Sequence, residues 1–149
     1  EKAYLHCTGL TVWDGSLVAY PTTSDPFFDQ WRGYTFPSFA DAQCSGPTDT
    51  LPDVPLESRF AAHDDTLYAL WGTDDSLQHY SMPDADLIDA VALEGVAGVL
   101  YGLSVLDEDR VVINSSGSGS LRIHSPTTGA LLDEVPVAKA TVGLHCVTN

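Results

Sequence analysis

The residues best suited to redox or metal chemistry are the three cysteines, Cys7, Cys44 and Cys146. The outer two stand near the two ends of the chain, each in the context Leu-His-Cys. If the ends meet, a Cys7–Cys146 disulfide would join them and leave Cys44 free or paired with another chain. Buried, reduced cysteines are the alternative. A zinc site made from both His-Cys pairs is disfavoured, because adjacent residues of a strand point to opposite faces.

Motifs for nucleophilic catalysis or phosphate binding are absent from the sequence. It contains no G-x-S-x-G elbow, and Gly117 and Gly119 fall in a predicted turn between strands rather than before a helix. Three histidines are expected at or beside strand ends, where a solvated or hydrogen-bonded imidazole is the usual case: His63, His79 and His124. Three carboxylates of the kind that glycosidases pair lie on a predicted turn or outer strand, away from any central pocket: Asp84, Asp86 and Asp89. Enzymatic activity stays open, and a non-catalytic protein is favoured.

Two features suit binding. The segment 27–39 is rich in aromatic residues, which either fill the core of a degenerate repeat or form a stacking surface for a sugar or a partner protein. The candidates for that surface are Trp31, Tyr34 and Phe36. Asn114 begins the tripeptide Asn-Ser-Ser, a glycosylation sequon at the entrance to a predicted turn. Such tripeptides also arise by chance, and the case for a glycan is strongest in a secreted protein.

The charge balance excludes one class of partner. With 21 acidic and 6 basic residues the formal net charge is −15, which repels phosphate backbones, so we expect no nucleic acid partner. Such acidity serves solubility or, alternatively, cation binding, and the run Asp107-Glu108-Asp109 is the candidate for Ca²⁺. An EF-hand loop is absent, so the signal for Ca²⁺ is weak, and we expect no other metal or cofactor. No run of 18 apolar residues predicts a membrane span.

Four short strands are predicted in residues 102–137, separated by tight turns rich in Asp, Ser, Gly and Pro. The strands are Leu103–Leu106, Val111–Asn114, Leu121–His124 and Leu131–Val137. The run Val111-Val112-Ile113 is apolar on both faces, so it should be covered on both sides. Pro136 has no N–H to give to a ladder, which favours an edge position for the last strand. This pattern predicts an up-and-down antiparallel sheet.

Residues 59–93 repeat this pattern. Leu67-Tyr68-Ala69 aligns with Val111-Val112-Ile113, and Leu87-Ile88-Asp89 aligns with Leu131-Leu132-Asp133, with one residue missing from the first turn of the earlier copy. A third, weaker copy begins at Gly9, where Asp14-Gly15 gives a hairpin signal. It then degenerates; we expect an outer strand near Gln30–Phe36 and a long irregular connection through Pro55. No amphipathic helix is predicted.

These repeats resemble the blades of the β-propeller superfamily, of the YVTN, NHL and quinoprotein-like kind, across about 120 residues. The resemblance implies an all-β, propeller-like array of about three four-stranded antiparallel blades in one domain, 1–149, with units near 5–45, 58–98 and 101–142 and a further strand at 143–149. It implies no particular function, because propellers host lectins, enzymes and docking scaffolds. The motifs that would narrow the family, a G-H…W-D pair or a kelch double glycine, are missing.

About three blades are fewer than a closed propeller needs, so we expect completion by another chain or by a segment beyond the 149 residues. The first residue is not Met and no leader precedes it, which suggests a processed terminus or the interior of a longer chain. An array of three blades should also expose an apolar face at each end. We therefore expect an extracellular, non-catalytic binding or assembly module that forms a homo-oligomer or filament or docks on partner subunits. The alternatives are part of a propeller enzyme, of quinoprotein or hydrolase type, and a propeller lectin that binds carbohydrate.

Overall fold

The computed structural model describes residues 7–13, 16–21, 32–36, 49–53, 59–70, 75–82, 84, 86–96, 100–115 and 119–137. These residues form twelve β-strands in three four-stranded antiparallel sheets, and no helix occurs among them. In the part of the chain described, no helix is long and apolar enough to cross a membrane. The expected all-β class is confirmed.

Each sheet is an up-and-down meander, with its strands in chain order. The first sheet contains β1 (Cys7–Trp13), β2 (Ser16–Pro21), β3 (Arg32–Phe36) and β4 (Asp49–Asp53). The second contains β5 (Arg59–His63), β6 (Thr66–Leu70), β7 (Ser76–Ser81) and β8 (Leu87–Ala92). The third contains β9 (Leu100–Asp107), β10 (Arg110–Ser115), β11 (Ser120–His124) and β12 (Leu131–Pro136).

The strand registers confirm the alignment of the second and third repeats. The equivalent pairs are Leu67–Tyr80 and Val111–His124, followed by Tyr68–His79 and Val112–Ile123. Both sheets also have a bulge at the same place, between His79 and Tyr80 in one and between Ile123 and His124 in the other. The extra residue of the third sheet's first turn is absorbed by a register shift between Arg110 and Val111. The second and third sheets therefore share both the positions of their turns and the register of their strands.

The first sheet follows the same register at its first hairpin. Val12 pairs with Leu17, as Val105 pairs with Val111 in the third sheet. The predicted outer strand near Gln30–Phe36 is present as β3. The structure differs from the prediction after β3, because Asp49–Asp53 is a strand of the same sheet rather than irregular connection, and it lies beyond residue 45. Its central Leu51-Pro52 carries no strand-like alternation, and Pro52 is tolerated because β4 is an edge strand.

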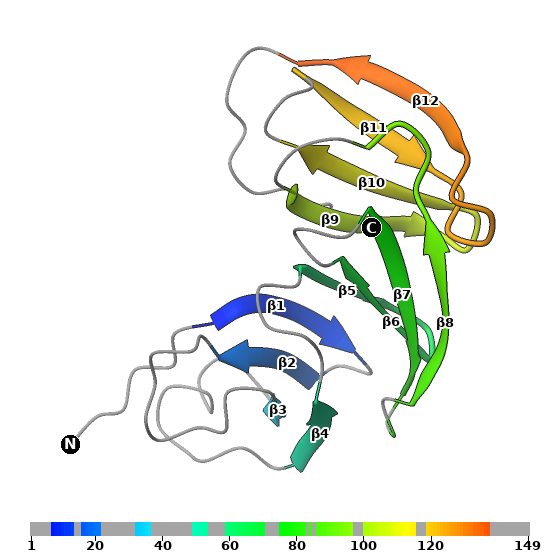
Figure 1. The fold of residues 1–149 in the computed structure, drawn as a ribbon. Helices are drawn as coiled ribbons and strands as arrows, with labels where there is room; N and C mark the ends of the chain where they lie inside the picture. The colour runs from blue at the N-terminus through cyan, green and yellow to red at the C-terminus, as the bar shows by residue number, and fades with distance from the viewer. Residues whose placement is uncertain are drawn as a thin grey trace.

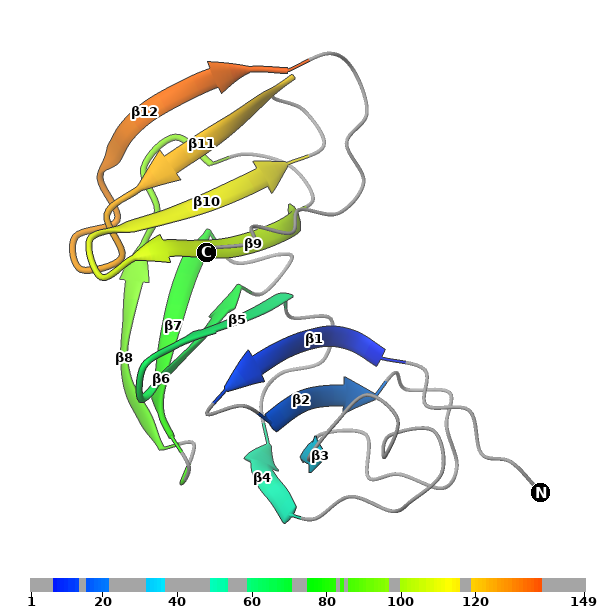
Figure 2. The ribbon, with the colours of Figure 1, turned by 180° about the vertical axis from the view of Figure 1, so that it is seen from behind.

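The three sheets lie around a line of neighbouring first strands. The first strand of the second sheet, β5, contacts both β1 and β9 (Figure 1). The fourth strands β8 and β12 lie far from this line, as the reverse view also shows (Figure 2). Sheets that radiate from their first strands in this way are propeller-like, and the position of Pro136 on the edge strand β12 is confirmed.

The core consists of two apolar clusters, one on each face of the second sheet. The cluster on the face away from the third sheet contains Phe60, Leu67, Ala69, Tyr80 and Met82. The cluster between the second and third sheets contains Ala61, Tyr68, Leu70, Leu77, Leu93, Val96, Leu103, Val111 and Ile113. Alternation along the strands sends successive side chains to the two clusters. The second sheet therefore has buried apolar side chains on both faces.

The aligned repeats predict burial at eight equivalent inner-strand positions, and five of these residues are fully buried. These five are at most 6% exposed: Leu67, Ala69, Leu103, Val111 and Ile113. The other three, Val105, Leu121 and Ile123, are partly buried. Val112 is 5% exposed, so the run Val111-Val112-Ile113 is buried on both faces, as its apolar pattern predicts.

The end face of the third sheet differs from the expectation of an open apolar patch. On the face turned away from the second sheet, Val112 and Asn114 are each 5% exposed and Ser104 is 9% exposed. These side chains are already shielded from solvent within one chain, so covering them a second time gains nothing. Val135 on the same face is 44% exposed, and assembly of the chain stays a prediction.

Candidate functional site

The junction between the second and third sheets is apolar near the first strands and polar toward the outer strands. Tyr68 belongs to the apolar cluster of this junction, and its register partner His79 lies on the same face of the second sheet. From the opposite side, Ile113 belongs to the same cluster, and its partner Arg122 lies on the same face of the third sheet. Polar side chains from both sheets are thereby brought to the outer half of one junction.

On the second sheet this polar part is a histidine–aspartate pair. His79 on β7 and Asp89 on β8 are register partners, and His79 Nδ1 contacts Asp89 Oδ1. The His79 side chain is 11% exposed, whereas that of Asp89 is 54% exposed. The Tyr68 ring lies edge-on to the imidazole, with centroids 5.0 Å apart. His79 Nε2 is buried without a hydrogen-bond partner.

The neighbouring phenols are held protonated. Burial, and then the negative charges of Asp64 and Asp89, raise the pKa of Tyr68 above 10.0. Burial also raises the pKa of Tyr80, whose hydroxyl donates to Gln78 Oε1 at 2.7 Å. Neither phenol can act as a base near neutral pH.

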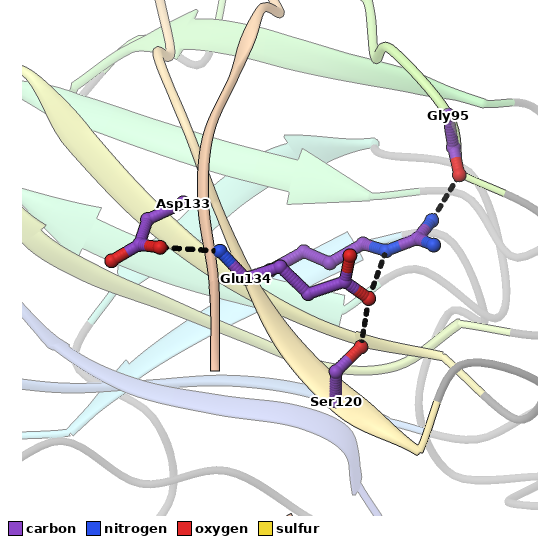
Figure 3. Close-up of polar contacts among 5 residues, drawn as sticks. Gly95, Ser120, Asp133 and Glu134 are labelled. Carbon is purple, nitrogen blue, oxygen red and sulfur yellow. Dashed lines mark hydrogen bonds and ion pairs between the residues drawn. The ribbon is translucent and has the colours of Figure 1, made fainter. Parts of the chain in front are cut away.

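On the third sheet the polar part is an ion-pair network (Figure 3). Arg122 Nε lies 3.4 Å from Glu134 Oε1, which also accepts a hydrogen bond from Ser120 Oγ. The hydrogen bond from Ser120, with the charge of Arg122, lowers the pKa of Glu134 below 4.5. Arg122 Nη1 donates to the carbonyl of Gly95, which belongs to the segment that connects the two sheets. Arg122 therefore ties β11 to the end of the second sheet.

The turn between β11 and β12 packs on the same connecting segment. Gly129 has φ of 73°, and a Cβ built there would lie 1.9 Å from the carbonyl oxygen of Ala92. Because only glycine permits both that φ and that approach, the turn contacts the backbone of the last residue of β8, directly before the connecting segment. The Gly129 carbonyl then accepts the Glu94 N–H at 2.9 Å, and Glu94 Oε2 accepts the Leu131 N–H at 3.3 Å.

The buried His124 side chain contacts the backbone of this turn. Its side chain is fully buried, and Nδ1 lies 3.1 Å from the Gly129 carbonyl oxygen. A carbonyl only accepts, so Nδ1 carries the proton and Nε2 is left as an acceptor, buried and without a partner. Burial lowers the pKa of His124 below 6.5, since the charged imidazolium would be poorly solvated there.

The geometry of the junction suits adhesion between sheets more than catalysis. General acid–base catalysis needs a ring nitrogen that reaches a substrate, and Nε2 is buried in both His79 and His124. Among the described residues no group of three His, Cys, Asp or Glu side chains could hold a metal ion. The polar groups are instead paired with each other or with backbone across the junction.

Most sequence-predicted site residues fall outside this junction. Cys7 begins β1, whereas Cys44 and Cys146 lie outside the described residues, so the disulfide and the free or intermolecular thiol stay predictions. Trp31 also lies outside them; Tyr34 and Phe36 belong to β3, and the aromatic binding surface stays a prediction.

Two further predictions fall on the third sheet. Asn114 lies in β10 with 5% exposure, so a glycan there, which stays a prediction, would have to be attached before that strand packs. In the acidic turn, Asp107 Oδ2 accepts a hydrogen bond from Arg110 Nε at 2.9 Å, so its carboxylate already has a cationic partner. The carboxylates considered for glycosidase chemistry are exposed: Asp84, Asp86 and Asp89.

In the sequence analysis His79 and Asp89 are considered separately, and their pairing is not predicted. Counting residues from the β7–β8 turn pairs Tyr80 with Leu87 and would place His79 opposite Ile88. The bulge between His79 and Tyr80 shifts the partner of His79 to Asp89.

The contacts of Arg122 with Gly95 and of Gly129 with Ala92 had no signal in the sequence either. They join segments that only the packing of one sheet on the next brings together.

Comparison with known proteins supports the fold and leaves the function open. No family model matches the chain, and no curated protein matches it. Among solved structures, it is similar to Myxococcus xanthus glutaminyl cyclase (TM-score 0.59, 13% identity, 92% of this chain and 76% of that chain). It is also similar to Kuenenia stuttgartiensis hydrazine synthase (TM-score 0.58, 13% identity, 90% and 37%) and to the computationally designed Ika8 protein (TM-score 0.58, 14% identity, 96% and 41%).

The two enzymes have propeller-type folds, which agrees with the propeller-like arrangement of the three sheets. Identities of 13–14% show the fold alone. The chain spans 41% of the designed protein and 37% of the hydrazine synthase chain.

Proposed function

We propose that this chain is a non-catalytic, extracellular binding or assembly module whose propeller-like sheets dock on partner protein subunits. The observation that carries the proposal is that both edge strands β8 and β12 carry exposed apolar side chains, and we call these side chains together the outer-edge surface. They are Leu87 and Ile88 on the two faces of β8, 57% and 60% exposed, and Leu132 and Val135 on β12, 52% and 44% exposed. Both strands are the last of their sheets.

The backbone of an edge strand favours an extended partner. An edge strand presents unpaired N–H and C=O groups, to which another chain can add as a further strand. Proteins usually protect such edges with Lys or Pro. On β12 Pro136 gives partial protection, whereas β8 contains neither residue. The edge of β8 is therefore the better docking site.

The charge around this surface indicates what would dock. Residues 84–96 and 125–137 contain no Lys or Arg, and exposed carboxylates flank the apolar side chains: Asp84, Asp86, Glu94 and Asp133. A second copy would bring another −15 of formal charge to this edge. We therefore commit to a partner segment that is extended and positively charged, with apolar side chains that alternate with Lys or Arg.

Peptide binding tests the proposal. Eight-residue extended peptides that alternate Val with Lys, Glu or Ser are titrated against the chain by fluorescence anisotropy. We expect the Lys peptide to bind more tightly than the other two. The variant Leu87→Ser/Ile88→Ser should weaken that binding, whereas Val12→Ser, at an equally exposed apolar residue (62%) on the first strand of another sheet, should leave it unchanged.

Three outcomes count against the proposal. Equal binding of the three peptides overturns the charged partner, and equal loss in the Val12→Ser control overturns the β8 edge. Native mass spectrometry at micromolar concentration gives the third: a homo-oligomer that the Leu87→Ser/Ile88→Ser variant dissolves would replace the basic partner with a second copy. Thiol counting and glycan analysis of the secreted protein test the extracellular assignment separately.

A further inference from the structure

The segment after the second sheet and the β11–β12 turn form a clasp that closes the outer end of the junction. The clasp comprises the Glu94 N–H on the Gly129 carbonyl, the Leu131 N–H on Glu94 Oε2, and the Arg122 guanidinium on the Gly95 carbonyl. Every one of these contacts joins the connecting segment to the third sheet. The clasp therefore fixes how the second and third sheets sit against each other.

His124 is the residue on which the clasp depends. Its Nδ1–H and the Glu94 N–H donate to the same acceptor, the Gly129 carbonyl. The imidazole is fully buried between β10 and the turn, with Val111 and Leu131 as register partners. The position of Gly129 therefore rests on a neutral imidazole with its proton on Nδ1.

Protonation of His124 would be opposed from several sides. A proton on Nε2 would be a buried donor, and that nitrogen has no acceptor within hydrogen-bond distance. The charged groups that face the ring are Arg122 from its own strand and Glu94 from the connecting segment. Glu94 would attract the imidazolium, but Arg122 would repel it and burial would penalise it most. The second sheet presents the Tyr68 phenol and the His79–Asp89 pair to the same junction.

We propose that the clasp is an acid-sensitive switch, in which protonation of His124 releases the β11–β12 turn from the connecting segment and loosens the third sheet from the second. The release lets solvent reach His124 Nε2, so this nitrogen is protonated more readily in the opened state than in the closed state. The proposal does not rest on the docking surface on β8, because Leu87 and Ile88 take no part in the clasp and only Glu94 is common to both.

The direction with pH follows from the sign of the shift. Burial lowers the pKa of His124 from 6.5 when the clasp is closed, whereas an opened, solvated ring returns toward that value. Above about pH 7 both states are neutral, and the clasp has its full stability. As the pH falls below 6.5, the opened state binds protons first, and the closed state loses up to about tenfold in population per pH unit.

The second buried histidine is an internal control. His79 is also buried and also has an unpartnered Nε2, but its Nδ1 faces a carboxylate rather than a carbonyl. His79 takes part in none of the hydrogen bonds of the clasp. Replacing His79 should therefore leave the acid response of the clasp unchanged.

Hydrogen exchange on the whole chain tests the switch. Protection of the amides at 93–96 and 125–131 is measured at pH 7.5 and 5.5 and corrected for the intrinsic pH dependence of exchange. We expect protection in both segments to fall about tenfold at pH 5.5, while strand β6 keeps its protection. In His124→Asn, whose amide can still donate to Gly129, the fall should disappear; in His79→Asn it should remain.

The proposal is overturned if protection does not fall in the unmodified protein, if His124→Asn shows the same fall, or if His79→Asn abolishes it. Where His124→Asn does not fold, an NMR titration of the unmodified protein decides. Protonation of the His124 ring should coincide with loss of protection at Glu94 and Leu131. A ring that titrates while both amides stay protected rules out the switch.

Discussion

The second and third sheets have one backbone design but fill their shared junction differently. Residue for residue, the pair His79–Asp89 of the second sheet corresponds to Ile123–Asp133 of the third. Conversely, the ion pair Arg122–Glu134 of the third corresponds to Gln78–Ala90 of the second. The repeat fixes which residues pair across the strands. In each sheet, the charged pair lies on the face that packs against the other sheet.

An aspartate recurs on the last strand of all three sheets, but the residue opposite it differs. Asp49, Asp89 and Asp133 occupy equivalent positions on the last strand of each sheet. Across the ladder from them stand Thr35, His79 and Ile123, three residues of different chemistry. Asp89 and Asp133 are both exposed, so each is solvated whatever residue stands opposite. Of these two described side chains, only Asp89 has a partner for its charge on the opposite strand.

The largest effect should come from Gly129→Ala. A methyl group there would overlap the Ala92 carbonyl, and φ of 73° is strained for any L-residue, so we expect a loss of about 4 kcal/mol in unfolding free energy. Gly119→Ala is the matched control, because Gly119 has φ of 61° but open space around it, and the loss should be about 1–2 kcal/mol. Urea unfolding measures both. Equal losses would mean that the turn does not pack tightly against the end of β8.

The next effect is on the apolar half of the junction. Ile113→Ala places in the third sheet the residue that the second has at the equivalent position, Ala69. Since Ile113 is 1% exposed in the cluster between the sheets, we expect a loss of about 3 kcal/mol. Ile88→Ala, at a residue 60% exposed, should change the stability by less than about 0.5 kcal/mol. A small loss for Ile113→Ala would show that the cluster can collapse around the cavity.

Replacing the equivalent residues Asp89 and Asp133 with Ala should lower the unfolding free energy by different amounts. Asp89→Ala leaves His79 Nδ1 buried without its carboxylate, which we expect to cost about 2 kcal/mol. Asp133→Ala removes only an exposed bond to the Glu134 N–H, opposite Ile123, and the change should stay within about 0.5 kcal/mol. The double variant should lose no more than the sum of the two. If thermal unfolding shows the same loss of stability for Asp89→Ala and Asp133→Ala, the contact of Asp89 with His79 contributes nothing specific to stability.

The sequence predicted what local periodicity determines. The alignment of Leu67-Tyr68-Ala69 with Val111-Val112-Ile113 gave the strands, the turn positions and the buried residues of two sheets, because alternation and turn chemistry are both local. The first sheet was harder to predict, and β4 was missed, since Asp49–Asp53 is short, contains Pro52 and lacks alternating apolar residues.

The junction could be predicted only in part. The alternation along β6 and β7 places Tyr68 and His79 on one face, but the bulge between His79 and Tyr80, which makes Asp89 the partner of His79, is not encoded in that alternation. The reach of Arg122 to Gly95, 27 residues away in the chain, depends on the angle between two sheets. No local pattern encodes that angle, because it results from how the side chains of the cluster fit together.

The smallest effect concerns the first hairpins, where the two sheets also differ. In the third sheet the Arg110 side chain hydrogen-bonds the Asp107 carboxylate across the turn, and this bond, more than the Asp109 N–H, lowers the pKa of Asp107 below 3.8. In the second sheet the corresponding carboxylate is Asp64, whose Oδ2 lies 3.8 Å from His63 Nε2, beyond hydrogen-bond distance. A group whose pKa is lowered by folding stabilises the protein above its unfolded pKa, here 3.8, and that contribution vanishes as the pH falls through the lower, folded value.

Arg110→Gln should therefore return the pKa of Asp107 toward 3.8 in an NMR titration. It should lower the urea midpoint slightly at pH 7 and not at all at pH 2. In 1 M salt the difference at pH 7 should shrink, because both side chains are in contact with solvent. A midpoint difference that persists at pH 2 would assign the effect of Arg110 to packing of its aliphatic stem instead of to its charge.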